Sequence, residues 1–437
     1  MIKVIKQMTQ EKTLHNSKNN ENDARYNEIK LKIGIFGTRR GQAFIKAIAF
    51  IDRAEVSALC DKNQESLSEA AKLCNNNVKT YSDFDSMLDS GIDAVILANY
   101  FTEHAKFAVK ALKRGIAVLS ETIPAATMAE CVELCRTVEQ TGTLYVFAEN
   151  YPYMRGPWEL KRINDTGVLG KICFAEGEYV HPEAPEDEKA HAPDKWHWRR
   201  YLPTTYYSSH SLAPLMFITG AMPKRVCAMC AQASEEFIAE RGRDRSEIAG
   251  IMLVYTDTGA VLRINGSTYL ASRGNWYRIA GEKGAAETVR GNDRSVTVRF
   301  NSWSRPDENT PRISTYEPLY PEHEEEASKC THSGSDYWIA KQFIDCLDAR
   351  ISGKSKGTEH FLNVYRAAAI SAVGILGWRS ALNGGIPYDI PDFADEDQRC
   401  AYENDNLTPF PTEKSANTLP YTLVSGTMPK INNSENN

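Results

Sequence analysis

The sequence predicts an α/β Rossmann domain followed by an α+β domain with an open, mostly antiparallel sheet. In the first part of the chain, short apolar runs alternate with helical patterns, as in a parallel sheet covered by helices on both faces. In the second part, strands with alternating apolar and polar residues follow one another between turn residues, as in an antiparallel sheet. A glycine-containing turn directly after the first apolar run is typical of a dinucleotide-binding domain.

The Rossmann pattern occupies residues 31–150. Its predicted strands cover residues 32–36, 55–60, 94–98, 117–120 and 144–148. Its predicted helices cover about residues 42–50, 63–74, 102–114 and 127–141. Ligands of such sheets bind at the carboxyl ends of the strands, so the residues that follow each strand are the candidates for function.

The second domain is predicted to span residues 151–395. Its predicted helices lie near residues 156–165, 211–219, 335–350 and 362–382. Its predicted strands cover residues 172–181, 225–233, 250–256, 260–267, 276–281 and 295–300. Outside the two domains, residues 1–30 are polar and predict a disordered leader, and residues 396–437 predict a C-terminal extension that ends in a solvated tail from residue 411.

Composition excludes several classes of function. The chain has 437 residues with 51 Lys and Arg against 57 Asp and Glu, so it lacks the basic surface that nucleic-acid binding requires. The longest apolar stretch, residues 367–378, is shorter than the roughly 20 residues that span a bilayer and predicts a buried helix. With no signal-peptide pattern, we expect a cytoplasmic protein without a membrane partner.

The ten cysteines fit reduced thiols in the cytoplasm. The one Cys-x-x-Cys pair, Cys227 and Cys230, lies in an alternating apolar run, and no second pair follows at the spacing of a zinc ribbon. No cluster of residues has the spacing of metal ligands, so no metal site is predicted.

The turn after the first strand contains Gly37, Thr38, Arg39 and Arg40. At such a turn, backbone amides at a helix N-terminus approach a pyrophosphate, although Arg39 stands where the fingerprint has its middle glycine. Asp61 closes the second strand, where a carboxylate accepts hydrogen bonds from a ribose diol and repels a 2′-phosphate. These residues predict NAD rather than NADP; the alternative is that Asp61 only caps a strand end.

The next two strand ends carry the segments Ala98–His104 and Leu119–Pro124. They resemble the Pro-Asn-x-x-His and Glu-Lys-Pro segments of the Gfo/Idh/MocA oxidoreductases, and the resemblance extends over about residues 31–395. It implies NAD or NADP in the first domain and oxidation or reduction of a sugar or polyol carbon in the second. It also implies that Asn99, His104 and Glu121 lie at the cofactor.

The usual catalytic residues of that family are only partly present. These are the lysine of Glu-Lys-Pro and, in the second domain, an Asp and a His four residues apart. His210 matches the histidine, whereas Thr122 and Ile123 occupy the lysine position and Tyr206 occupies the aspartate position. Thr and Ile cannot transfer protons at neutral pH, and Tyr, with a pKa of about 10, needs an activating environment.

One branch of the family, the NAD-dependent glycosidases of the α-N-acetylgalactosaminidase type, departs in a similar way. The chain resembles that branch at residues 123–131, 148–150, 178–181 and 207–214. This resemblance implies a tightly held NAD, oxidation at C3 of the sugar, elimination of the aglycone, addition of water and re-reduction. It adds Glu149 to the cofactor site, and the proton-transfer candidates are His210, Tyr179, His181, Tyr206 and Tyr207. For Tyr179 and His181, simple packing on a strand is an equal alternative.

The loop 182–207 is rich in aromatic and basic residues. Trp196 and Trp198 are candidates for stacking on sugar faces, and Arg199 or Arg200 for holding an acidic or hydroxylated substituent. The alternative is a surface loop whose aromatic residues pack on the sheet. His332 lies in a segment that resembles a His-Gly-Gly segment of the family, and it is predicted either to contact substrate or only to help cap the following helix.

Together these observations predict NAD-dependent hydride transfer at a carbohydrate carbon, with His210 as the main acid/base and Tyr179 as its helper. The first alternative is redox-neutral glycoside hydrolysis, and the second is an NAD-bound sensor without catalysis. Because the exposed sheet often pairs subunits in this family, we expect a homo-oligomer, a dimer or a tetramer.

Overall fold

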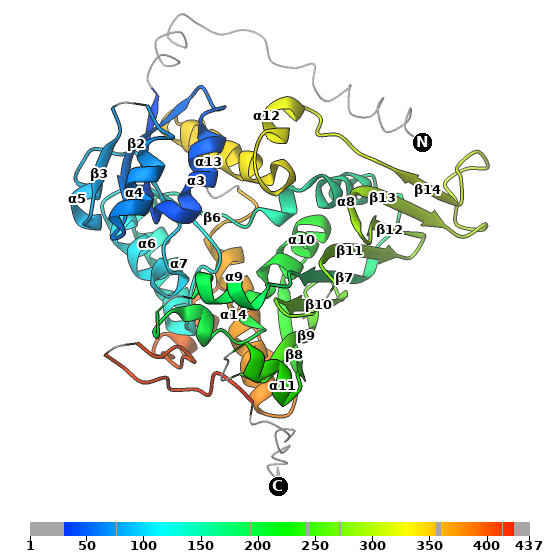
Figure 1. Ribbon diagram of the computed structural model, residues 1–437. Helices are drawn as coiled ribbons and strands as arrows, with labels where there is room; N and C mark the ends of the chain where they lie inside the picture. Colours follow the sequence, from blue (N-terminus) through cyan, green and yellow to red (C-terminus); the bar gives the residue numbers. More distant parts are fainter. Residues whose placement is uncertain are drawn as a thin grey trace, which may run out of the picture.

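The structure is a computed structural model that describes residues 30–75, 77–192, 194–241, 245–270, 272–354, 360–412 and 414–423. Within these residues the chain forms two sheets with their helices, the Rossmann sheet and the second sheet (Figure 1). The predicted leader, apart from Lys30, lies outside the described residues, and so does the last part of the predicted tail.

The Rossmann sheet is parallel and has the strand order β3-β2-β1-β4-β5-β6. This is the order of a dinucleotide-binding fold, whose topological switch point lies between β1 and β4. The strands are β1 (Leu31–Phe36), β2 (Ala54–Cys60), β3 (Lys79–Tyr81), β4 (Ala94–Leu97), β5 (Ala117–Ser120) and β6 (Tyr145–Phe147). Every residue of β4 and β5 is buried, which explains their continuous apolar sequences.

Helices cover both faces of this sheet: α3 (Thr38–Ile48), α4 (Gln64–Ala71), α5 (Phe84–Leu88), α6 (His104–Lys113) and α7 (Met128–Thr141). The first helix starts earlier than the sequence pattern indicated, because Gly37 adopts a left-handed φ of 91° and turns the chain at once into α3. Helix α7 begins with a capping box between Thr127 and Glu130 and ends at Gly142.

The second sheet has nine strands in the order β14-β13-β12-β11-β7-β10-β9-β8-β15. Only β7 and β10 pair in parallel, which confirms an open, mostly antiparallel sheet. The strands are β7 (Ile172–Val180), β8 (Pro223–Gln232), β9 (Glu247–Thr256), β10 (Val261–Ser267), β11 (Gly274–Gly281), β12 (Gly284–Val289), β13 (Asn292–Phe300), β14 (Ile313–Tyr316) and β15 (Tyr388–Asp389). The sequence pattern missed β12 and the short strands β3, β14 and β15.

Two long helices return the chain to the Rossmann domain. Helix α13 (Ser335–Ile351) packs against α3, and α14 (Val364–Leu382) packs against both α7 and β8. The interior of α14 is buried and includes Trp378, as predicted for the apolar stretch. No helix in the described part of the chain is long and apolar enough to cross a bilayer.

The remaining elements are shorter. They are α8 (Arg155–Asp165), α9 (Pro185–His191), α10 (Ser209–Thr219), α11 (Glu235–Glu240), α12 (Glu324–Ser328) and α15 (Glu396–Arg399), with 3₁₀ turns that include η2 (Tyr151–Tyr153), η3 (Trp198–Arg200), η4 (Tyr206–Ser208) and η5 (His332–Gly334). The sequence predicted a solvated tail from residue 411, whereas residues 420 and 423 of the C-terminal extension contact the second domain. The indole of Trp378 donates to Pro420 O at 2.7 Å, and the backbone of Leu423 donates to Glu247 on β9.

Helix α10 lies at the centre of the second domain, directly on β7 (Figure 1). A Cβ atom at Gly177 of β7 would lie only 2.1 Å from Ser211 O, so the helix backbone rests on the strand backbone. This close approach fixes the first turn of α10, which carries His210. The glycine is therefore required by packing.

We expect Gly177→Ala to lower the free energy of unfolding by about 1 to 3 kcal/mol, because the added methyl group must displace α10. Denaturant titration measures this difference. Gly274→Ala on β11 is the matched control, because nothing lies within 4 Å of its added Cβ. Equal stability of the two variants would contradict the close packing of α10 on β7.

Candidate active site

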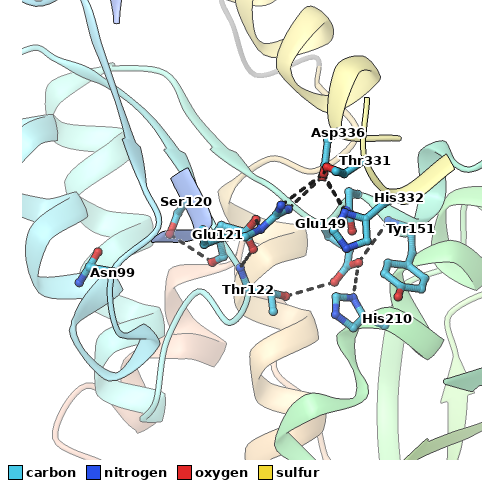
Figure 2. Close-up of polar contacts among 12 residues, drawn as sticks. Asn99, Ser120, Glu121, Thr122, Glu149, Tyr151, His210, Thr331, His332 and Asp336 are labelled. Atoms are coloured by element: carbon cyan, nitrogen blue, oxygen red, sulfur yellow. Dashed lines mark hydrogen bonds and ion pairs between the residues drawn. The ribbon is translucent and has the colours of Figure 1, made fainter. Parts of the chain in front are cut away.

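The residues of the central polar network come from the carboxyl ends of the Rossmann strands, the first turn of α10 and the start of α13 (Figure 2). Glu121 and Thr122 follow β5, and Glu149 follows β6. His210 and Asp336 come from α10 and α13. Segments that are distant in sequence therefore share one site between the two sheets.

The turn after β1 is held by Asp61. One carboxylate oxygen of Asp61, Oδ2, accepts from Thr38 N at 2.7 Å and from Thr38 Oγ1 at 2.8 Å, and Oδ1 accepts from Asn63 N at 2.9 Å. A Cβ atom at Gly37 would lie 2.4 Å from the carbonyl group of Ala98, so β1 and β4 approach closely here. The sequence predicted Asp61 as a ribose ligand, and the structure adds a role in shaping the turn.

The residues at this turn fit a dinucleotide. Helix α3 points its N-terminus at the end of the sheet, where a pyrophosphate binds, and Arg39 beside it is exposed. A carboxylate offers about four acceptor positions, so Asp61 keeps capacity for ribose hydroxyls. Asn99 Oδ1, at the end of β4, is buried without a hydrogen-bond partner among the described residues. A bound ribose or nicotinamide amide would satisfy it.

Arg40 joins the turn to the rest of the site. Its Nε donates to Glu121 at 2.7 Å, and its two terminal nitrogens donate to Asp336 at 2.9 and 3.2 Å. Every nitrogen of the guanidinium therefore contacts a carboxylate. The sequence predicted Arg40 near the pyrophosphate, whereas the structure makes it the link between α3, β5 and α13.

Asp336 is fully buried and accepts hydrogen bonds from four side chains in all. Besides Arg40, they are Asn150 at 2.8 Å, His332 Nδ1 at 2.7 Å and Thr331. Burial by itself raises the pKa of the Asp336 carboxyl, but Arg40 and His332 outweigh it and hold that pKa well below its usual range. Asp336 is therefore ionised at neutral pH.

His210 and Glu149 form the second carboxylate–imidazole pair. The distance from His210 Nδ1 to Glu149 Oε1 is 2.6 Å, and the Glu149 side chain is fully buried. The other oxygen of Glu149 accepts from Thr122 Oγ1 at 3.2 Å, and this hydroxyl also lies 3.0 Å from Ser209 Oγ. At the position of the family's lysine, the chain thus places a hydroxyl that hydrogen-bonds the partner of the histidine.

Three tyrosines surround the His210 ring. Tyr151 stacks on it at 4.2 Å between centroids, and Tyr179 and Tyr207 lie at 4.6 and 5.1 Å. Burial raises the pKa of all three phenols, so they are neutral hydrogen-bond donors at physiological pH. The sequence singled out Tyr179 and Tyr207 but missed Tyr151, although it follows Glu149 by two positions.

The other predicted catalytic and substrate residues lie at the edge of this group. The rings of His181 and Trp198 are 5.9 Å from Tyr179 and 6.4 Å from Tyr207, and Arg199 lies 4.4 Å over Trp198. The ring of His332 is 6.5 Å from Tyr151, and Figure 2 shows it grouped with Tyr151 and His210. Trp196 is in none of these ring contacts; the amino group of Lys195 lies 4.8 Å over its ring.

Two predicted residues face elsewhere. Tyr206 donates to Ala126 O at 3.5 Å and packs on Phe410, so its hydroxyl points away from His210 into the protein interior. The two nitrogens of His104 face the carbonyl oxygens of Ile123 and Asn99 at 3.0 and 3.1 Å. Burial lowers the pKa of His104 to about 4, so the neutral ring has one N–H and donates it to one of these two carbonyls.

The sequence matches models of known protein families. Residues 31–149 match the oxidoreductase family GFO_IDH_MocA, described as an NAD-binding Rossmann fold, and residues 158–287 match the GFO/IDH/MocA C-terminal domain. The chain belongs to the Gfo/Idh/MocA family. It is therefore an enzyme of an oxidoreductase family, and its cofactor is NAD. Residues 272–399 match, in addition, the C-terminal domain of glycosyl hydrolase 109.

Two relatives that are similar over most of their length have names of the glycosyl hydrolase type. A glycosyl hydrolase family 109 protein of Solibacter usitatus is 27% identical over 401 residues, which cover 83% of this chain and 88% of the relative. An alpha-N-acetylgalactosaminidase of Tannerella forsythia is 26% identical over 414 residues, covering 83% and 86%.

Solved structures of this fold include sugar dehydrogenases. Levoglucosan dehydrogenase, in complex with NADH and levoglucosan, superposes with a TM-score of 0.69 at 18% identity and covers 83% of this chain and 100% of that one. The WlbA dehydrogenase of Bordetella pertussis has a TM-score of 0.64 at 21% identity, covering 83% and 98%. At these identities the likenesses show that the chain shares the fold of these two enzymes.

We expect Arg40→Gln to lower the free energy of unfolding by about 2 kcal/mol at about pH 7, because it leaves Asp336 buried without its main counter-ion. The value lies below that for a fully buried pair because the Arg40 side chain is 30% exposed. Asp336 has a lowered pKa in the folded state, so the pair stabilises the fold above the unfolded pKa of about 3.9 and loses this effect as the pH falls below it. Denaturant titrations from about pH 7 to about pH 3 measure the difference.

The matched control is Arg39→Gln, because Arg39 is exposed and has no ion pair among the described residues. Its stability should follow the wild-type curve. If Arg40→Gln loses the same stability at every pH, its effect does not come from the charge of Asp336.

Proposed function

We propose that the protein transfers a hydride between NAD and a carbohydrate carbon, with His210 as the acid/base that moves the proton of the reacting hydroxyl. The observation that carries this proposal is the buried pair of His210 and Glu149, at 2.6 Å, beside the carboxyl ends of the Rossmann strands. A histidine oriented by a carboxylate is a general base with one ring nitrogen available to a substrate.

NAD, when bound, accepts a hydride from the substrate carbon and can return it. Residues that fit it are Gly37, Thr38, Arg39 and Asp61 at the turn, Asn99 after β4, and Glu121 after β5. Arg40 and His104 then act as positioning residues, because every side-chain nitrogen of the two faces a protein oxygen.

His210 acts through Nε2, since Nδ1 is committed to Glu149. As Nε2 takes the hydroxyl proton, the imidazole becomes cationic, and the buried Glu149 carboxylate stabilises that charge. Thr122 and Tyr151 N also donate to Glu149 and keep its carboxylate oriented. The neutral phenols of Tyr179 and Tyr207 are suited to donate hydrogen bonds to sugar oxygens beside His210.

A second candidate is redox-neutral glycoside hydrolysis. Its support is the match of residues 272–399 to the C-terminal domain of glycosyl hydrolase 109 and the relatives of that name. That chemistry needs a further group for the proton next to the oxidised carbon and for the departing aglycone. His332, oriented by Asp336 and 40% exposed, is the candidate for this role, and His181 is another.

Two further parts of the proposal concern the whole protein. We place it in the cytoplasm, where its ten cysteines would remain reduced. We also propose that it forms a dimer or tetramer through the outer face of the second sheet, where Met229, Ile251, Leu253 and Tyr255 are each between 44% and 58% exposed. Light scattering measures the oligomeric state.

We expect His210→Asn to lower kcat by about 10²- to 10⁴-fold with little change in the affinity for NAD, because the histidine moves a proton and does not hold the cofactor. Steady-state kinetics and NAD titration measure the two quantities. His323→Asn is the matched control, since His323 packs on Tyr337 and Trp338 and pairs with Glu326. Unchanged turnover in His210→Asn would remove His210 from the mechanism.

The two candidate functions differ in their products. Incubation of the NAD-loaded protein with free sugars should accumulate NADH if the reaction is a net oxidation. Incubation with aryl glycosides should release the aglycone without net NADH if the reaction is redox-neutral. Bound NAD with neither product over a broad sugar panel would contradict both candidates and favour a sensor.

A further inference from the structure

We propose that a cavity next to His210 and its surrounding tyrosines binds an anionic substituent of the sugar: a carboxylate, a sulfate ester or a phosphate ester. The inference rests on the proposed function in taking the ligand to be a sugar. It deepens that function by naming the chemical class of the substrate.

The cavity has a volume of about 210 Å³ and lies between α9, η3 and the segment that follows β10. Four cations line it: Lys189, Arg199, Arg200 and Arg241. Among the described residues, two carboxylates, those of Glu183 and Glu188, line it as well. The lining therefore carries an excess of positive charge, which favours an anion.

The carboxylates do not neutralise the arginines that face the cavity from η3. Glu188 pairs with Arg241 at 3.3 Å, and Glu183 lies 3.5 Å from His191. Among the described residues, Arg199 and Arg200 have no carboxylate partner; Arg200 donates instead to the backbone carbonyls of residues 192 and 194. These carbonyls hold its guanidinium in place while leaving its charge uncompensated.

A smaller adjoining cavity shares Leu202, Thr268 and Tyr269 with the first and adds Tyr207 and Arg245. Arg245 is only 3% exposed and donates one terminal nitrogen to Tyr269 Oη at 2.8 Å. Its Nε has no hydrogen-bond partner in the part of the chain that the structure describes. A buried guanidinium with an unsatisfied donor is costly. The smaller cavity, of about 10 Å³, has room for a single oxygen of an anion, which would supply the missing acceptor.

The position of these cavities connects them to the proposed chemistry. Tyr207 lines the smaller cavity, and its ring is 5.1 Å from that of His210. Arg199 lines the larger cavity and lies 5.9 Å over the same Tyr207 ring. A sugar whose hydroxyl reaches His210 can thus direct a substituent past Tyr207 toward the arginines. The planar donor fork of arginine suits carboxylate, sulfate and phosphate oxygens better than neutral hydroxyls.

Calorimetric titration of the NAD-loaded protein tests this inference without requiring turnover. The ligands are matched pairs: D-glucuronate against D-glucose, and the 6-sulfate and 6-phosphate of D-galactose against D-galactose. We expect at least one anionic sugar to bind about tenfold or more tightly than its neutral partner, and to lose this advantage at high salt. The pair with the largest difference identifies the substituent.

Arg245→Gln should remove most of the anionic preference and leave the affinity for the neutral sugar nearly unchanged. Because Arg245 is buried, Arg200→Gln provides a second test at an exposed position that is easier to alter without unfolding. The matched control is Arg225→Gln on β8, whose side chain is 56% exposed and pairs with Asp389 far along the sheet. This control should keep the wild-type preference.

Equal binding of anionic and neutral sugars overturns the inference, and so does inorganic sulfate or phosphate that binds as tightly as the anionic sugars. If the anionic sugar binds selectively but no sugar is turned over, the binding site stands while the proposed function fails. If neutral sugars are turned over and the arginine variants leave the affinity for the anionic sugars unchanged, the proposed function stands and this inference fails.

Discussion

The buried carboxylate of Asp336 and its contact with Arg40 are the constraint on which the site depends. Arg40 leaves the turn after β1, Glu121 leaves β5, and Asp336 begins α13, so one guanidinium joins three segments. A buried carboxylate without a counter-ion is destabilising, so this pair favours the arrangement of the two domains that keeps Arg40 on Asp336. The same carboxylate orients His332 toward the site.

The second carboxylate–imidazole pair shows how this chain compensates for the missing lysine. In place of the lysine amine it has the hydroxyl of Thr122, which contacts Glu149 rather than a substrate. Glu149 in turn is the partner of His210. In the proposed mechanism, proton transfer is thereby concentrated on His210, whose orientation is fixed by Glu149 from the Rossmann side of the site. The ends of the neighbouring strands β5 and β6 carry Glu121, which is proposed to lie at the cofactor, and Glu149, the partner of His210. The proposed cofactor site and the proposed acid/base are therefore positioned by the same edge of the sheet.

Tyr151 lies between the two pairs. Its ring stacks on His210 and faces His332 at 6.5 Å, and its backbone N–H contacts Glu149. Beyond the neighbouring Tyr207, the loop that carries Arg199 and Arg200 supplies positive charge. The site thus has acid/base groups near the Rossmann strands and a cavity lined by arginines on the other side of Tyr207. This arrangement favours a substrate with one reactive hydroxyl and one anionic end.

The sequence by itself determined the Rossmann domain, the mostly antiparallel second sheet, the cofactor and the family, because apolar periodicity and strand-end motifs are local properties of the chain. It also singled out His210, Tyr179 and Tyr207, which the structure brings together. It expected Glu149 at the cofactor, whereas the structure pairs Glu149 with His210. Short edge strands such as β3 and β15 were missed, because they have too few residues to show a period.

Only the tertiary structure decided what each polar side chain contacts. It turned Tyr206 into the interior beside Ala126 and placed His104 between two backbone carbonyls. It also showed that Arg40 is engaged by Asp336, which lies almost 300 positions further along the chain. Such pairings depend on how helices such as α13 return to the Rossmann sheet, and no local pattern of residues encodes that packing.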